Sequence, residues 1–327
     1  MSKAFPRGRI CWNELMTTDT KAAKAFYKGV VGWGTQGWEQ DSSYVMWTTG
    51  KTPIGGLMTL PDQAKQMGAP PSWLMYVAVP DVDESVRQAV GLNARAHVEP
   101  QDIPNMGRFA VLADPQGATF GVFSANGEIP GHDKEPKLGE FSWHELAARD
   151  ARAAWGFYEQ LFGWEKMDAM DMGELGTYQT FGRAGVMLGG MYDKPADMPM
   201  PPNWLCYALV PNADKAAKVV ERLGGKILNG PMDIPGGGRI AQCLDPQGAA
   251  FAVHSNESAE KAKPKAKLSA KKAAKKAKKA KKKATKAAKK VAKKAAKQAK
   301  KLAKKAAKQA KKQAKKAKKA AKKATKK

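Results

Sequence analysis

The sequence is poor in the features that mark secreted, disulfide-bonded and membrane-spanning proteins. Its three cysteines, Cys11, Cys206 and Cys243, are odd in number and widely spaced, which argues against a disulfide framework or a zinc knuckle. No run of about 18 apolar residues occurs, and the first residues lack the apolar core of a signal peptide. We therefore expect a cytoplasmic protein in a reducing compartment, without a transmembrane segment.

The C-terminal stretch 261–327 lacks acids, arginine and aromatic side chains. It holds 34 of the 57 basic residues of the chain, and the stretch 1–260 carries the remaining 23 together with all 30 acidic ones. A body with a net charge of −7 is thus followed by a tail with a charge of +34. These two parts require separate interpretations.

The body is an internal duplication. When the sequence is aligned with itself so that Trp12 meets Trp143, WNEL falls on WHEL, and DPQGA at Asp114 falls on DPQGA at Asp245. Such self-similarity indicates homologous domains. We predict domain 1 over 1–126, a linker over 127–137, domain 2 over 138–256 and a Lys/Ala-rich basic tail over 257–327.

Each domain divides again into two similar halves. An alternating strand is followed by an aspartate that can cap a helix; Asp19, for example, precedes a segment with apolar residues at helical spacing and a plausible stop at Gly32. Three shorter strands follow, with DPQG as the turn before the last. The predicted fold class is α+β, with four βαβββ modules in two domains.

This module order, with the lines WNELMTTDTKAAKAFYKGVVGW and FAVLADPQGATFGVF, resembles the vicinal oxygen chelate superfamily, which includes glyoxalase I, bleomycin-resistance and extradiol dioxygenase proteins. The likeness covers residues 8–125 and 139–255. It implies that two modules curl an eight-stranded sheet into a cup that holds a ligand, often around a divalent metal.

The resemblance also implies where metal ligands would lie. In metal-using relatives, ligands occupy the positions of Trp12, Leu74 and Gly121 in domain 1, and the matching positions fall on Trp143, Leu205 and Ala252. None of these side chains can bind a divalent cation. One carboxylate per cup does not make a metal site, so no cofactor is predicted. The alternative is a metal-dependent lyase or dioxygenase that uses Glu14 or Glu145 with ligands not yet identified.

Because successive side chains of a strand point to opposite faces, Trp12 and Glu14 should face the cup while Leu15 packs under the helix. A carboxylate beside a Trp in a concave wall can have a raised pKa, so Glu14 and Glu145 are the candidates for a catalytic base or a ligand anchor. The alternative is that the aromatic residues are packing and that the glutamates are paired or solvated. The predicted small-molecule contacts are Trp12, Glu14, Tyr76, Arg108, Trp143, Glu145, Tyr207 and Arg239.

The histidines do not indicate a common site. His97 and His132 have no histidine at the matching position of the other copy. His144 stands next to Glu145, but adjacent residues of a strand face opposite sides. We expect structural positions for these and for His254, and the sequence leaves open whether the protein is an enzyme.

The tail is typical of a polyanion-binding segment. From Val291 it follows an eleven-residue repeat that aligns alanine along one helical stripe, although like charges four residues apart oppose the helix until a polyanion neutralises them. Lysines without aromatics contact phosphates and do not read bases. Its composition resembles that of linker-histone tails.

Nucleic acid or another polyanion is the expected partner of the tail, with possible nucleoid association; a solubilising tail and a histone-like architectural protein with non-catalytic cups are the alternatives. The candidate contacts are Lys271, Lys272, Lys275, Lys276, Lys293, Lys294, Lys304, Lys305, Lys315 and Lys316.

Overall fold

The computed structural model describes residues 5–173 and 176–256. The lysines and the helical repeat predicted for the tail lie outside these residues. The described part contains sixteen strands in two eight-stranded sheets, together with five helices. No helix in this part is long and apolar enough to span a membrane.

The elements follow the module order that the sequence predicts. The first half comprises β1 (Ile10–Thr17), α1 (Thr20–Val30), β2 (Gly34–Trp38), β3 (Asp41–Thr49), β4 (Thr52–Thr59), α2 (Asp62–Gln66), β5 (Ser72–Ala78), α3 (Val82–Gly91), β6 (Arg95–Ile103), β7 (Gly107–Ala113) and β8 (Thr119–Ala125). The second half comprises β9 (Phe141–Ala148), α4 (Ala151–Phe162), β10 (Glu165–Asp171), β11 (Thr177–Arg183), β12 (Val186–Asp193), β13 (Asn203–Leu209), α5 (Ala213–Arg222), β14 (Lys226–Asp233), β15 (Arg239–Leu244) and β16 (Ala250–Ser255). The sequence did not predict the short helix α2.

Each sheet is built by the two modules of one domain. The strand order is β2-β3-β4-β1-β5-β8-β7-β6 in the first sheet and β10-β11-β12-β9-β13-β16-β15-β14 in the second. The two first strands of the modules pair antiparallel at the centre, β1 with β5 and β9 with β13. The α+β class with four βαβββ modules is confirmed, and each cup forms within a domain.

Local sequence signals explain where the helices begin. Asp19 caps α1 by accepting a hydrogen bond from the Ala22 N–H at 2.9 Å, and Asp81 and Asp150 do the same for α3 and α4. Such caps satisfy one of the free N–H groups in the first helical turn. The helix α4 ends at Gly163, whose φ of 67° is left-handed and suits glycine.

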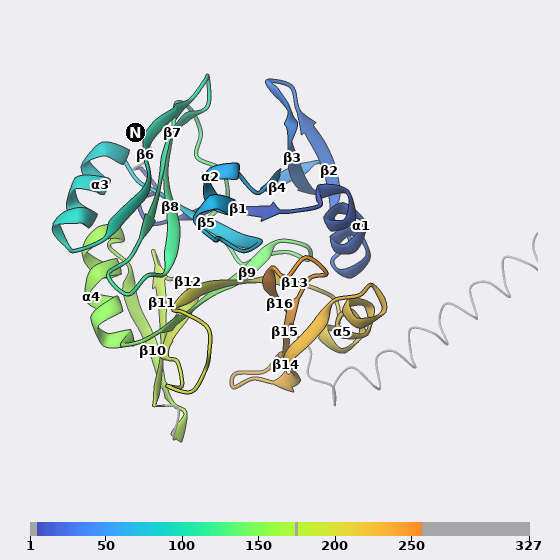
Figure 1. The fold of residues 1–327 in the computed structure, drawn as a ribbon. Coiled ribbons are helices and arrows are strands. Elements are labelled where there is room, and N and C mark those ends of the chain that lie inside the picture. The colour runs from blue at the N-terminus through green and yellow to red at the C-terminus, as the bar shows by residue number, and fades with distance from the viewer. Residues whose placement is uncertain (1–4, 174–175, 257–327) are drawn as a thin grey trace, which may run out of the picture. The chain divides into compact units, whose positions relative to one another are not determined.

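The two sheets curve away from each other, and their helices pair at the two sides (Figure 1). Helix α1 packs against α5, and α3 packs against α4. One hydrophobic core therefore joins the first module to the fourth, with Leu15 and Phe251 among its residues. A second core joins the second module to the third.

The aromatic pair of α1 reaches across to the other domain. The Tyr27 hydroxyl donates a hydrogen bond to the Asp245 carboxylate at 3.1 Å, and the Trp73 indole N–H donates to the Tyr27 hydroxyl at 2.9 Å. Tyr27 is fully buried. Buried polar groups must be hydrogen-bonded, so this chain fixes the packing of domain 1 against the DPQGA turn of domain 2.

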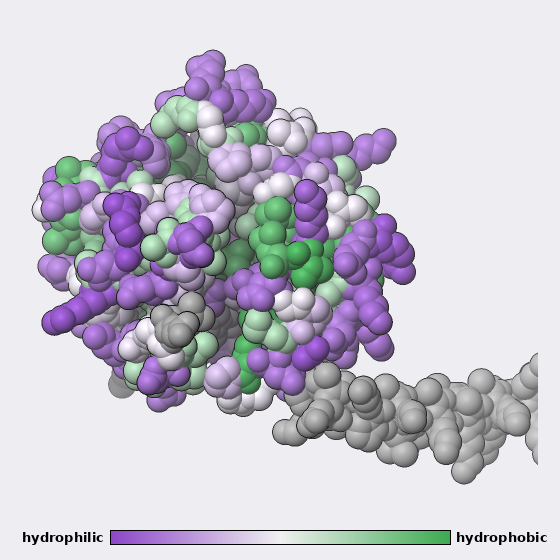
Figure 2. Space-filling model, turned by 60° about the horizontal axis from the view of Figure 1, so that its bottom comes forward, coloured by the Kyte–Doolittle hydropathy of each residue, from purple (hydrophilic) through white to green (hydrophobic). Residues whose placement is uncertain are grey.

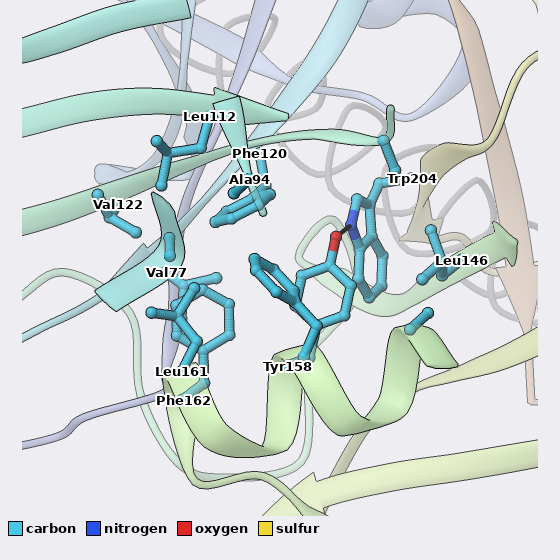
Figure 3. Close-up of a cluster of buried hydrophobic side chains, with 14 of the residues drawn as sticks. Val77, Ala94, Leu112, Phe120, Val122, Leu146, Tyr158, Leu161, Phe162 and Trp204 are labelled. Carbon is cyan, nitrogen blue, oxygen red and sulfur yellow. Dashed lines mark hydrogen bonds between the residues drawn. The ribbon is translucent and has the colours of Figure 1, made fainter. Parts of the chain in front are cut away.

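The reciprocal chain occupies the second core. Tyr158 donates to Asp114 at 2.9 Å and accepts from Trp204 at 2.9 Å; the Tyr158 ring lies among Phe120, Leu146 and their neighbours (Figure 3). Both strongly repeated motifs, the FY pair and DPQGA, thus serve the contact between the domains.

Equivalent residues also meet where the central strands of the two sheets approach. Asn13 and His144 are both buried, and the His144 Nε2 donates to the Asn13 Oδ1 at 2.9 Å. Burial lowers the pKa of His144 to about 4, so the imidazole is neutral at pH 7. His144 has the structural position expected for it.

Candidate functional site

A buried carboxylate lies on the face of the first sheet opposite to the helices, which we call cup 1. Glu14 of β1 is 7 % exposed. The Tyr44 hydroxyl donates to its Oε2 at 2.6 Å, and the Tyr76 hydroxyl donates to its Oε1 at 3.2 Å. Tyr44 in turn accepts from the Trp12 indole N–H at 3.0 Å. These four residues form the Glu14 cluster.

The same arrangement recurs on cup 2, the corresponding face of the second sheet. Glu145 of β9 is 8 % exposed and accepts hydrogen bonds from the hydroxyls of Tyr178 and Tyr207, each at 2.9 Å. The Trp143 indole N–H donates to Tyr178 at 2.8 Å. Gln242 of β15 adds an amide donor, 3.0 Å from Glu145 Oε1 and 2.8 Å from the Tyr207 hydroxyl. These five residues form the Glu145 cluster.

Glycines on the neighbouring strands make room for the tyrosines. A Cβ atom at Gly56 of β4 would lie 2.0 Å from the Tyr44 hydroxyl oxygen, and one at Gly190 of β12 would lie 2.2 Å from the Tyr178 ring. Such distances are far below van der Waals contact. The glycines therefore permit the tyrosines to cross the strand and reach the carboxylate.

The surroundings of each carboxylate are apolar or neutral. Burial raises the pKa of both Glu14 and Glu145, and the tyrosine hydrogen bonds act in the opposite direction. Burial and the nearby carboxylates also raise the pKa of Tyr44 and Tyr178, which keeps both as hydroxyl donors. Within residues 5–173 and 176–256, no cationic side chain bonds either glutamate.

The two cups differ in the residues that surround these clusters. In cup 1, Phe109 and Phe123 pack with Tyr76 and Ile129 in one hydrophobic group. In the alignment that places Trp12 on Trp143, the equivalents of Phe109 and Phe123 in cup 2 are Ile240 and His254.

A hydroxyl–imidazole pair is present in cup 2 alone. A register shift in β9 lies beside Ser142, and the Ser142 Oγ lies 3.1 Å from the His254 Nδ1. The equivalents of these two residues in cup 1 are Cys11 and Phe123. Burial lowers the pKa of His254, which favours a neutral ring at pH 7. Cup 2 is therefore the more polar of the two.

The two candidate arginines lie in ion pairs with aspartates. Arg108 contacts Asp83 at 2.6 Å and Asp102 at 2.9 Å, and Arg239 contacts Asp214 at 2.8 Å and also Asp233. Their side-chain bonds go to these carboxylates and not to the Glu14 or Glu145 cluster. The structure thus unites Trp12, Glu14 and Tyr76, and likewise Trp143, Glu145 and Tyr207, without the arginines.

The positions at which the resemblance to the family places metal ligands offer none here. Leu74 pairs with Glu14 across the strands, and Gly121 pairs with Tyr76. A Cβ atom at Gly121 would lie 2.2 Å from the Tyr76 ring, so the tyrosine fills the space that a ligating side chain would need. Within the described part of the chain, no three His, Cys, Asp or Glu side chains are grouped for a metal. The residues present do not fit a family-type metal centre.

Several members of these clusters were absent from the sequence prediction. Tyr44 and Tyr178 occupy matching positions of the two copies, but their contact with the glutamates depends on strand β3 or β11 lying two places from the central strand. Gln242 has no polar equivalent, because Val111 occupies its position in domain 1. The repeat of Tyr44 was the one signal available.

Figure 2 views the molecule from the lower side of Figure 1, towards which the ends of β10 and β14 extend. This face is hollowed near its centre, and hydrophobic side chains border the hollow. Trp143, Tyr178 and Gln242 are half-buried. A mostly apolar concave surface with a few convergent polar groups is typical of a small-molecule site.

Comparison with known proteins places both halves in one family. The model of the glyoxalase/bleomycin resistance protein/dioxygenase superfamily matches residues 140–253, and that of the glyoxalase-like domain matches residues 9–123. The chain is 33 % identical over 253 residues to the "Putative glyoxylase CFP32" of Mycobacterium tuberculosis, covering 76 % of this chain and 95 % of that protein. It is 29 % identical over 268 residues to the anthracycline biosynthesis protein DauV of a Streptomyces species, covering 76 % and 94 %.

Solved structures share the fold at low sequence identity. The Mn(II)-bound glyoxalase of Novosphingobium aromaticivorans matches with a TM-score of 0.51 and 15 % identity, over 78 % of this chain and 83 % of that one. The 2,3-dioxygenase LapB of a Pseudomonas species matches with a TM-score of 0.53 and 11 % identity, over 79 % and 94 %. With two matching domains and a relative of nearly equal body length, the chain belongs to the glyoxalase/bleomycin resistance protein/dioxygenase superfamily.

Proposed function

We propose that this protein binds a small organic molecule on the concave faces of its sheets, with cup 2 as the principal site, and that Glu145 anchors the ligand or transfers a proton to or from it. The observation that carries the proposal is the buried carboxylate held by two tyrosine hydroxyls beside a tryptophan. The same constellation recurs around Glu14, so it is a feature of both domains.

The electrostatics of the Glu145 cluster suit proton transfer. Burial raises the pKa of Glu145, and a general base works best when its pKa lies near the operating pH. Tyr178 and Tyr207 fix the carboxylate through its two oxygens, leaving it oriented without a positive charge that would weaken its basicity. Such a carboxylate can accept a proton from a bound acid or donate one back.

We infer that the cups work without a metal centre of the family type. The support is the donor set: the ligand positions hold tryptophan, leucine and glycine or alanine, and the single carboxylate is already engaged by tyrosines. The alternative is a metal-dependent lyase or dioxygenase, as the Mn(II)-bound glyoxalase and the dioxygenases of similar fold would suggest. Elemental analysis of the purified chain decides between them, because stoichiometric Mn, Fe, Ni or Zn would overturn the metal-free assignment.

A thermal-shift screen of metabolites tests small-molecule binding. A ligand at one hundred times its Kd stabilises the native state by about 2.7 kcal/mol, which is readily detected. The expected result is a compound that raises the Tm of the wild-type chain but not that of the variant with both Trp143→Ala and Glu145→Ala. If every stabilising compound acts equally on the variant, cup 2 is not the site.

We propose further that the lysine-rich tail holds the protein on nucleic acid or another polyanion. The support is composition: the 34 lysines of the stretch 261–327, without acids or aromatics, favour phosphate contacts that do not depend on base sequence. If about ten lysines engage, log K should fall with log salt with a slope of about −9.

Deletion of residues 261–327 tests the role of the tail and also the alternative of an architectural protein with non-catalytic cups. The body has a net charge of −7 and should not bind DNA at physiological salt. If the shortened chain binds as tightly as the full chain, binding does not belong to the tail.

A further inference from the structure

We propose that the ligand of cup 2 is a small organic cation, a protonated amine on a compact apolar body, with its N–H directed at Glu145. This inference rests on the proposed function, because it names the ligand class of the same site. It does not depend on whether the ligand is chemically converted.

The first argument is charge. Glu145 is 8 % exposed, and its hydrogen-bond donors, the hydroxyls of Tyr178 and Tyr207 and the amide of Gln242, are all neutral. Neutral donors satisfy hydrogen bonds but do not balance a negative charge, and an unbalanced buried charge is costly. A cationic ligand would supply the missing charge.

The hydrogen bonds of the cluster fit an ionised carboxylate at its centre. The Trp143 N–H donates to Tyr178, which leaves the Tyr178 proton to point at Glu145. Gln242 likewise donates to Tyr207, whose proton points at Glu145. All these protons converge on the carboxylate, and none of the partners is a pure acceptor for a carboxylic O–H.

The remaining binding capacity of the carboxylate fits an amine. An ionised carboxylate has about four acceptor positions, and three are used by the donors of the cluster. One N–H of an ammonium group can take the last. A divalent metal is usually held by several carboxylate, imidazole or thiolate ligands, and the cluster has one carboxylate.

The second argument is the aromatic wall. Tyr192 stacks on Tyr178 with ring centroids 6.0 Å apart and an interplanar angle of 17°. The Trp143 indole N–H donates to the hydroxyl of the same Tyr178. Aromatic faces carry negative potential and attract organic cations. They also provide apolar contact area for the body of the ligand. Carboxylate and aromatic rings together favour a cation over an anion or a neutral molecule.

Cup 2 is favoured over cup 1 by the residues nearby. Where cup 1 has Phe109 and Phe123 packed around its tyrosine, cup 2 has Ile240 and His254. The lowered pKa of His254 leaves that ring uncharged at neutral pH, so it does not repel a cation. The hydrogen-bonded pair of Ser142 and His254 adds polar groups to cup 2 where cup 1 has Cys11 and Phe123.

Calorimetry with a matched pair of probes tests this inference on the full chain. Phenethylamine carries an ammonium group where 2-phenylethanol carries a hydroxyl, and the two have similar apolar bodies. We expect the amine to bind at least about 30-fold more tightly, because leaving a buried charge unpaired is expensive. The body that carries cup 2 has a net charge of −7, so nonspecific attraction of a cation must be separated from binding at Glu145 by variants.

The Glu145→Gln variant should lose the preference for the amine, while Glu159→Gln, which removes an exposed carboxylate from α4, should keep it. Equal binding of the two probes to the wild-type chain, or an amine preference that survives Glu145→Gln, would overturn the inference. The wild-type comparison needs no variant and remains decisive if Glu145→Gln fails to fold. If a neutral compound binds against Trp143 while the amine does not, the cation inference fails but the proposed function stands.

Discussion

Cup 1 and cup 2 have the same centre and different surroundings. Each holds a buried glutamate bonded by two tyrosines and, through one of them, by a tryptophan. Around this centre, the positions of Val111 and Phe123 in cup 1 are taken by Gln242 and His254 in cup 2. The common centre is the part of the cups that the two domains share.

The difference supports cup 2 as the proposed site of polar recognition. In cup 1, apolar side chains pack with Tyr76. Cup 2 instead has the amide of Gln242, the imidazole of His254 and the hydroxyl of Ser142. Duplicated domains that differ only around a shared centre can divide their roles. Under the proposed function, cup 2 is the ligand site and cup 1 is the internal comparison.

The largest expected effect is on stability at low pH and comes from His144, whose counterpart in the first half is Asn13. The folded-state pKa of His144 is about 4, below the value of about 6.5 in an unfolded chain. The unfolded state therefore binds more protons between these values, and the free energy of unfolding falls as the pH drops from about 6.5 to about 4, by about 3 kcal/mol. Denaturant titrations of the wild type and of His144→Asn should differ by this loss, and parallel pH profiles would refute it.

Loss of the buried tyrosine hydroxyl should lower the free energy of unfolding by a similar amount in both inter-domain contacts. Tyr27→Phe and Tyr158→Phe each remove a hydroxyl that joins a buried indole N–H to an aspartate. We expect each variant to lose about 2 kcal/mol of unfolding free energy, because buried polar partners are left unsatisfied. Urea denaturation measures both losses. A large loss of unfolding free energy in only one variant would contradict the equivalence of the two contacts.

Gly121 and Ala252 should differ because the cups differ in packing. A Cβ at Gly121 would overlap the Tyr76 ring, so we expect Gly121→Ala to cost about 1–2 kcal/mol and to weaken the Tyr76 bond to Glu14. Cup 2 already accommodates Ala252, which is fully buried against Tyr207. Thermal denaturation checks the loss, with Ala252→Gly as the control expected to leave the Tyr207 bond intact.

The smallest effect is that of exchanging Gln242 and Val111. Gln242→Val removes a donor from Glu145, so the pKa of Glu145 should rise further; Val111→Gln should lower the pKa of Glu14 if the new amide reaches it. A single hydrogen bond of this kind contributes about 1 kcal/mol. Carbon NMR of the labelled carboxyl groups reports both values, and an unchanged Glu145 titration would show that Gln242 does not act on the carboxylate.

Most of the fold could be predicted because its signals are local and occur twice. The helix caps, the glycine stops and the two-residue strand period are read within short segments. The same period predicted that Glu14 and Glu145 each lie on the cup face of their own strand. The bond between Tyr27 and Asp245 could not be predicted, because it joins residues 218 positions apart.

The cup residues that differ between the domains could not be predicted from the sequence for a related reason. A search for internal repeats selects identities, and Gln242 and His254 are recognisable as site residues only when Val111 and Phe123 are seen at the same places in a folded sheet. Arg108 is the converse case: it is repeated as Arg239, yet both arginines bind aspartates near the helices. Repetition therefore located the fold more reliably than the site.

The central claim is that cup 2 is the ligand site. A crystal structure of the full chain with the most stabilising compound from the thermal-shift screen tests it directly. The account predicts ligand density in contact with Trp143 and Glu145 on the concave face of the second sheet. Density that lies outside this face, with the Glu145 cluster untouched, would contradict it.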